Sequence, residues 1–166
     1  MTLIDFEIEQ TANPLDMIEQ IAALNEWQHE RSTDDEIIVS LTGLWADYHL
    51  SFTWMNDLET LHLACALDMR VPDNRKSEVV KLLALVNEHL WLGHFDLWSD
   101  EGLVMFRSAL LLAGASEATP EQLETMFTNA VDCCDRHYQA FQFVIWAGRP
   151  AGEALTSAMF ETVGEA

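Results

Sequence analysis

Basic residues are scarce in this sequence of 166 residues. Eight lysines and arginines stand against 28 aspartates and glutamates, so the formal net charge is −20. A surface with this balance repels phosphate groups and offers no basic stripe to a nucleic acid. We therefore expect neither nucleic acid nor membrane among the partners. The acidic excess has two interpretations that stay open: it keeps the protein soluble, or it attracts a cationic protein.

Cysteines and long apolar runs are also few. The three cysteines, two of them adjacent at Cys133 and Cys134, form neither a disulfide framework nor a CxxC metal motif. No apolar stretch reaches the roughly 18 residues of a membrane span. The first residues, MTLIDFEIEQ, lack the basic start and apolar run of a secretory signal. These absences favour a cytoplasmic protein. We expect Cys134 to belong to the apolar face of a helix and Cys133 to be incidental.

The common catalytic and cofactor motifs are missing as well. The sequence contains no GxGxxG, no phosphate loop ending in GKS or GKT, no HExxH and no GxSxG. A weak alternative is a polar sheet face that carries His49 and His62 with Ser51, Thr53 and Thr60. A Ser–His pair can support nucleophilic catalysis, but it also needs an orienting acid and an oxyanion donor. A solvated sheet face has the same pattern, so we predict no catalytic residues, no cofactor and no enzyme.

What is present begins with a helix after Asn13. Asn13 is a good N-cap, Pro14 suits the first helical position, and Asp16 lies in the first turn. Apolar residues at helical spacing predict a buried face made of Leu15, Ile18, Ile21, Ala22 and Leu24.

A period of two then replaces the helical period. Apolar and polar residues alternate over residues 36–44, 48–55 and 59–71, which predicts half-buried antiparallel strands. A polar edge strand is expected over residues 26–32. A two-residue turn at Asn56 and Asp57 would place Phe52 opposite Leu61 and Leu50 opposite Leu63.

The second half of the chain returns to helices. One is expected from Asp73 to a stop at Gly93, followed by a hairpin of HFDLW and GLVMFRSALLL. Thr119, Pro120 and Gln122 form the start of a long helix that ends near Gly148. The fold class is α+β, a twisted antiparallel sheet with packed helices, in the order α-β-β-β-β-α-β-β-α-α. We expect one domain over residues 1–166, with a possible arm or strand over residues 1–12 and a short helix within residues 150–166.

Residues 87–102, NEHLWLGHFDLWSDEG, concentrate histidine, tryptophan and carboxylate side chains. His89, His94 and Asp96 are weak candidates for metal ligands, because zinc takes three or four nitrogen, sulfur or carboxylate ligands. A histidine near a helix C-terminus and carboxylates in a turn are also favoured without any metal. We therefore predict a joint between helix and hairpin, and no metal site.

Large aromatic residues mark candidate contact surfaces. Trp45 and Trp98 fall near turns, where they either anchor a partner or cap the edge of the core. The run AFQFVIWAG, with Phe141, Phe143 and Trp146, is apolar nearly all round and must be buried on every side. This pattern predicts a subunit contact at the end of the long helix.

Four runs of the sequence resemble the YbjN family of bacterial sensory transduction regulators. They are PLDMIEQIAALNEW, LALVNEHLWLGHFDLWSDEGLVMFRSALLLAG, TPEQLETMF and HYQAFQFVIWAGRPAGEAL, and the resemblance covers about residues 13–163. It implies a fold similar to type III secretion chaperones, which are small, acidic, usually dimeric and bind other proteins without catalysis. It carries over no functional residues.

These observations lead to two hypotheses about function. The first is a non-enzymatic, homodimeric chaperone-like or regulatory adaptor that binds a protein partner, possibly basic, in the bacterial cytoplasm. Its binding surface would be an apolar groove beside the first helix, or a sheet edge. The alternative is a small-molecule or metal-sensing regulatory domain.

Overall fold

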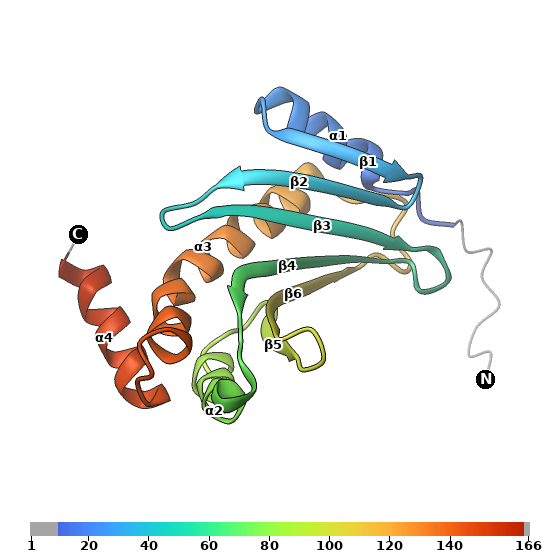
Figure 1. Ribbon diagram of the computed structural model, residues 1–166. Helices are drawn as coiled ribbons and strands as arrows, with labels where there is room; N and C mark the ends of the chain where they lie inside the picture. Colours follow the sequence, from blue (N-terminus) through green and yellow to red (C-terminus); the bar gives the residue numbers. More distant parts are fainter. Residues whose placement is uncertain (1–9, 165–166) are drawn as a thin grey trace.

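The computed structural model describes residues 10–164 and shows the predicted α+β order of elements (Figure 1). Most of the arm or strand expected over residues 1–12 lies outside the described residues. In chain order the helices and strands are α1 (Leu15–Leu24), β1 (Gln28–Thr33), β2 (Glu36–Thr42), β3 (Asp47–Met55), β4 (Thr60–Arg70), α2 (Lys76–Asn87), β5 (His94–Trp98), β6 (Leu103–Leu111), α3 (Pro120–Ile145) and α4 (Ala151–Gly164). Within residues 10–164, no helix is long and apolar enough to cross a membrane.

The six strands form one open antiparallel sheet in the order β1-β2-β3-β4-β6-β5. Helix α1 packs on β1 and β2, and α3 crosses β4 and β6 (Figure 1). Helix α2 lies against β5 and α3, while α4 lies against α3 and α2. Alternate strand residues supply the covered face because successive side chains point to opposite sides of a sheet. The side chains of this face that have no exposed surface are those of Ile37, Val39, Leu50, Phe52, Leu61, Leu63, Cys65, Val104 and Phe106.

Aromatic rings join α3 to the sheet at two points. The Phe127 ring lies 5.0 Å from that of Phe52, measured between ring centroids. The Phe95 ring lies 5.3 Å from the rings of both Phe106 and Phe141. Such pairs contribute roughly 0.5–1.5 kcal/mol each beyond the burial of their area. The two clusters therefore hold α3 across the sheet and keep β5 attached to the same core.

The register of the β3–β4 hairpin differs from the prediction by two residues. Phe52 pairs with Leu63, and Trp54 pairs with Leu61. The two-residue turn was wrong, because residues 56–58 form a 3-10 turn and Glu59 adopts a left-handed conformation with φ 46°. A shift by two residues leaves every side chain on its predicted face, since the side-chain period of a strand is two.

Three helix ends also differ from the prediction. Leu24, expected in the buried face of α1, is 84% exposed at the end of that helix. Helix α2 ends at Asn87, six residues before Gly93, because the Asn87 side chain turns to bond the backbone of β5. Helix α3 ends at Ile145 and not near Gly148. Its start is confirmed: Thr119 and Gln122 form the reciprocal capping box.

The apolar end of α3 is covered largely by this chain itself. Phe141 and Val144 are fully buried, and Ile145 is 6% exposed. Helices α4 and α2 pack against α3 and supply the cover. Trp146 alone among the large side chains of this end stands out, with 62% of its surface exposed.

Candidate binding groove

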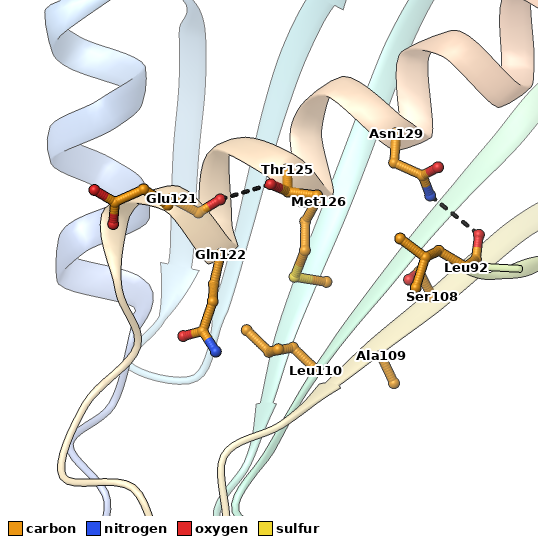
Figure 2. A pocket seen from close by; sticks show the side chains of 9 residues that line it. All are labelled: Leu92, Ser108, Ala109, Leu110, Glu121, Gln122, Thr125, Met126 and Asn129. Carbon is orange, nitrogen blue, oxygen red and sulfur yellow. Dashed lines mark hydrogen bonds between the residues drawn. The ribbon is translucent and has the colours of Figure 1, made fainter.

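A groove opens between the second half of β6 and the first half of α3. Its cavity measures about 350 Å³, and its apolar lining comes from Leu92, Leu110 and Met126. Figure 2 shows the side chains of Leu110 and Met126 pointing toward one another across the space between strand and helix. Cavities that hold ligands begin at about 300 Å³, so the groove can accept apolar side chains from outside the chain.

The groove is open because β5 is shorter than β6. Pairing between these strands ends at His94 and Arg107, four residues before β6 itself ends. At Gly93 the chain turns away with φ +82°, a conformation that glycine adopts without strain. A side chain there would also collide, since its Cβ would lie 2.5 Å from Phe106 and 2.8 Å from the Arg107 carbonyl oxygen.

Polar side chains hold the two walls of the groove in place. The Asn129 amide on α3 donates a hydrogen bond of 3.0 Å to the Leu92 carbonyl oxygen (Figure 2). The Thr125 hydroxyl donates to the Glu121 carbonyl oxygen at 2.7 Å, so it is turned back onto its own helix. The wall facing β6 is therefore fixed and largely apolar.

The outer rim of the groove is acidic. A shallower hollow of about 500 Å³ continues from the groove along α3, and its lining includes Glu121, Glu124 and Asp132. These residues share one face of the helix because positions three or four apart are neighbours. Among the described residues, no lysine or arginine lines either cavity. The rim thus presents negative charge beside an apolar floor.

Trp91 was not among the predicted contact residues. It lies in the loop between α2 and β5, and 98% of its surface is exposed. Leu92 beside it is 57% exposed at the mouth of the groove. The signal in the sequence was a pair of apolar residues directly before Gly93, at a place where the predicted helix would have continued.

The predicted contact residues are scattered over the structure. Trp98 ends β5 and is 41% exposed, while Trp45 is half-buried in the β2–β3 turn. Phe143 is partly buried under the Arg149 guanidinium, which lies 4.6 Å from the ring centroid. Phe141 is fully buried within the chain and is not available to a partner in this conformation.

The candidate metal ligands do not form a coordinating group. His89 lies beyond the end of α2, where it is close to Glu88 at 3.3 Å. His94 and Asp96 lie on β5, and the Asp96 carboxylate pairs with Arg107 at 3.3 Å. Across the described part of the chain, no three histidine, cysteine, aspartate or glutamate residues are placed to hold a metal ion.

His62 belongs to the same polar arrangement on the open face of the sheet. The Arg107 Nε donates to His62 Nε2 at 3.2 Å, which requires a free lone pair on that nitrogen. Burial, the Arg107 charge and His94 lower the pKa of His62 below its usual value. Asp96, Arg107 and His62 therefore form a chain of polar contacts, in which the histidine accepts a hydrogen bond from the arginine.

His49 forms the Ser–His contact considered from the sequence, but with a different serine. Its Nδ1 is hydrogen-bonded to the Ser40 hydroxyl at 2.7 Å across β2 and β3. The pair is exposed, and within residues 10–164 no carboxylate is hydrogen-bonded to His49. Among these described residues, neither Ser51 nor Thr53 is hydrogen-bonded to His49. The arrangement is a hydrogen bond between neighbouring strands on a solvated face.

The cysteines are placed as core residues. Cys65, Cys133 and Cys134 are all buried. A hydrogen bond with Cys65, together with burial, raises the pKa of Cys134, and burial raises that of Cys133. A raised pKa lowers the fraction of reactive thiolate. Cys133, interpreted as incidental from the sequence, thus shares the buried face of α3.

The fold and the groove define an α+β protein built on one open antiparallel sheet with its helices gathered on one face. The chain belongs to the YbjN family, described as "Putative bacterial sensory transduction regulator", which matches residues 14–143. Among solved structures it is similar to one described as "Crystal structure of YbjN, a putative transcription regulator from E. coli", with a TM-score of 0.53 and 11% identity, over 73% of this chain and 85% of that one. No curated protein sequence matched the chain.

Proposed function

We propose that this protein is a non-enzymatic regulatory adaptor of the bacterial cytoplasm that binds a protein partner in the groove between β6 and α3. The support comes from one observation: a fixed apolar groove of about 350 Å³, open at Leu92 and bordered by an acidic helix face. Apolar floors with polar rims are the usual anatomy of protein-binding sites. The family description as a regulator agrees with this function.

The acidic rim sets the expected kinetics of binding. Glu121, Glu124 and Asp132 attract a cationic partner, so association is fast at low salt and slows as salt rises. The apolar contacts at Leu92, Leu110 and Met126 then determine how long the complex lasts. A partner of this kind would carry apolar anchors flanked by lysine or arginine.

The test uses two matched substitutions on exposed leucines. Leu92→Glu places a charge at the mouth of the groove, where Leu92 is 57% exposed, and Leu24→Glu places the same charge on α1, where Leu24 is 84% exposed. Each variant and the parent are used to capture proteins from native cytosol at low and moderate salt. The captured protein is then produced alone, and its dissociation constant is measured for all three.

The expected result is a partner that binds the parent and Leu24→Glu equally and binds Leu92→Glu at least tenfold more weakly. Equal affinity for all three proteins would show that the groove is not the binding surface. A bait that captures no protein and instead carries a bound small molecule or metal would overturn the adaptor function in favour of a sensor.

We also include a homodimer in the proposal, formed away from the groove at the end of α3. The support is Trp146, which is 62% exposed next to the partly buried Phe143. Sedimentation velocity of the parent and of Trp146→Glu tests this surface: a dimer that becomes a monomer is expected, and a parent that sediments as a monomer would remove the dimer.

A further inference from the structure

Strand β6 is paired unequally on its two edges. Its pairing with β4 continues to the end, where Leu111 lies opposite Thr60. Its pairing with β5 stops at Arg107. Ser108–Leu111 thus has one edge in the sheet and one edge that no residue in the described range 10–164 pairs.

The hydrogen bonds of β5 identify which backbone groups are free on that edge. The Asn87 amide bonds both the N–H and the carbonyl oxygen of Phe95, at 2.8 and 2.9 Å, from the side away from β6. In an antiparallel pair the bonded residues alternate, so Phe95 and its partner Phe106 are a non-bonded pair and His94 bonds Arg107. The N–H and carbonyl of Arg107 therefore point outward toward β5.

The same alternation extends along β6. Two and four residues beyond Arg107, the N–H and carbonyl groups of Ala109 and Leu111 also point outward, away from β4. The next residue confirms the parity, because the Leu112 N–H donates inward to the Glu59 carbonyl at 2.9 Å. Ala109 is exposed, and Leu111 is 70% exposed. Two donors and two acceptors are thus presented in a row beside the groove.

The other exposed edges of the sheet are protected. At β5, the Asn87 side chain occupies the hydrogen-bonding groups of Phe95. At β1, the register shifts between Arg31 and Thr33, and the strand is polar. Bulges, polar residues and covering groups are how proteins prevent unwanted strand pairing. The second half of β6 carries Ala109 and Leu111 in place of these devices.

We propose that the partner binds by strand addition: an extended segment, apolar at alternate positions and flanked by lysine or arginine, pairs with Ala109 and Leu111. This inference rests on the proposed function. Alternate side chains of an added strand point to one face of the sheet, here into the groove between Leu110 and Met126. The flanking cations then lie near the acidic face of α3.

Two other segments could occupy this edge: a strand of a second copy of the chain, or residues 1–9. The negative charge at the groove disfavours both. A second copy would bring the same Glu121, Glu124 and Asp132 rim against the first, with a net charge of −20 on each chain. Residues 1–9, MTLIDFEIE, carry three acidic side chains, Asp5, Glu7 and Glu9, and no basic one. Like charges at such a site weaken association, so a cationic segment is favoured.

The probe is a synthetic peptide, acetyl-KKVTLTVKK-amide, added to the full chain labelled with ¹⁵N. Two further versions carry N-methyl groups, one on the threonines and one on the valines and leucine, so that each loses the N–H groups of one edge. A fourth version replaces the lysines with glutamates. Hydrogen exchange of the Ala109 and Leu111 amides and the dissociation constant from NMR titration are measured for each peptide.

Strand addition predicts slowed exchange at Ala109 and Leu111, and a loss of affinity of at least tenfold for one N-methylated version but not for the other. The glutamate version should bind at least tenfold more weakly. Ala109→Pro removes an N–H that is not bonded to β4, so the fold should survive and binding should weaken, as proline is tolerated on a free edge. If that variant does not fold, the comparison of the two N-methylated peptides still tests strand addition.

Other outcomes overturn the inference in distinguishable ways. Binding in the groove that tolerates both N-methylated peptides would leave the proposed function intact and eliminate strand addition. Slow exchange of the Ala109 and Leu111 amides before any peptide is added would show that this edge is already paired. If dilution speeds the exchange, the edge pairs with a second copy of the chain. If removal of residues 1–9 speeds it, the edge pairs with those residues. No binding by any peptide would refute the cationic segment, while the capture experiment with Leu92→Glu would still test the groove.

Discussion

The Tyr48 hydroxyl donates a hydrogen bond of 2.7 Å to Asp135 Oδ1, joining the start of β3 to the middle of α3. The same carboxylate oxygen accepts the Leu44 N–H at 2.9 Å. Burial and the Asp135 carboxylate raise the pKa of Tyr48 above its usual value, so the hydroxyl keeps its proton. One aspartate therefore holds a sheet turn and a helix together over 87 residues of sequence.

Replacing this tyrosine should measure the strength of the contact. Tyr48→Phe removes the hydroxyl from a site that is 1% exposed, and we expect a loss of about 1.5–3 kcal/mol in the free energy of unfolding. Tyr138→Phe is the control, because its ring packs at 6.3 Å from Tyr48 but no hydrogen bond of its hydroxyl is recorded among residues 10–164. Urea unfolding should show less than about 0.5 kcal/mol for the control. Equal losses would show that ring packing, and not the hydrogen bond, dominates.

Gly43 explains how the turn reaches Asp135. A Cβ at this position would lie 2.2 Å from Tyr48 Cε2 and 2.6 Å from Asp135 Oδ1. Gly43→Ala should therefore displace both partners and destabilise the protein by about 1–3 kcal/mol. Gly152→Ala in α4 is the matched control, since no atom of the described residues lies within 4 Å of its Cβ and alanine favours helix. If thermal unfolding shows both variants equally stable, the turn can move aside without cost.

His137 makes the stability sensitive to acid. It is 7% exposed on α3, its two ring nitrogens have no hydrogen-bond partner among residues 10–164, and the Phe95 ring lies 5.7 Å away. Burial, with Arg136 and His89, lowers the pKa of His137 to about 4 in the folded protein. The unfolded chain binds a proton near pH 6.5, so the stability that His137 retains above that pH is lost as the pH falls toward 4.

The linkage gives a measurable difference between variants. Between pH 7.5 and pH 5, a shift from about 6.5 to about 4 costs the folded state about 2 kcal/mol. His137→Leu removes this cost, so its stability relative to the parent should rise by that amount over the interval in urea unfolding. Val144→Ala, a substitution in the same helix that does not titrate, should shift stability equally at both pH values. If the stability of His137→Leu changes with pH by the same amount as that of the parent, His137 is protonated in the folded protein or exposed to water.

The element order was predictable because local patterns specify it. The change of period after Glu36, the Thr119 capping box and Gly102 in the β5–β6 turn each act within a few residues. The register of the β3–β4 hairpin was not predictable in this way. It depends on whether the turn contains only residues 56 and 57 or all four residues 56–59. Both registers put Phe52 on the buried face, so the hydrophobic pattern does not discriminate between them.

The groove could be predicted only in part. HFDLW has five residues and the strand after it nine, so a hairpin between them must leave part of β6 unpaired. The position of α3 beside that unpaired part depends on the Phe95 and Phe127 clusters, which join residues far apart in sequence. Trp91 and Leu92 were not recognised because a helix was expected to continue through them to Gly93. Asn87 ended that helix by a contact with Phe95 that no local pattern contains.

Asn87 also predicts what happens when a protected edge is opened. Asn87→Ala removes both hydrogen bonds to Phe95 and exposes the N–H and carbonyl oxygen of β5 on its outer side. We expect a loss of about 1–3 kcal/mol in the free energy of unfolding, because two paired groups lose their partners. The exposed edge should also promote association between copies. This association should increase with salt concentration, because salt screens the repulsion between the acidic chains.

Asn56→Ala is the control for this experiment, since Asn56 is exposed in the β3–β4 turn and its side chain makes no hydrogen bond recorded in the described chain. Exchange of the Phe95 amide should accelerate in Asn87→Ala and stay unchanged in Asn56→Ala. Light scattering at moderate salt should then separate the two variants. A Phe95 amide that remains slow to exchange in Asn87→Ala would show that burial of the Phe95 ring, and not the asparagine, protects this edge, and β5 would offer no second site for strand addition.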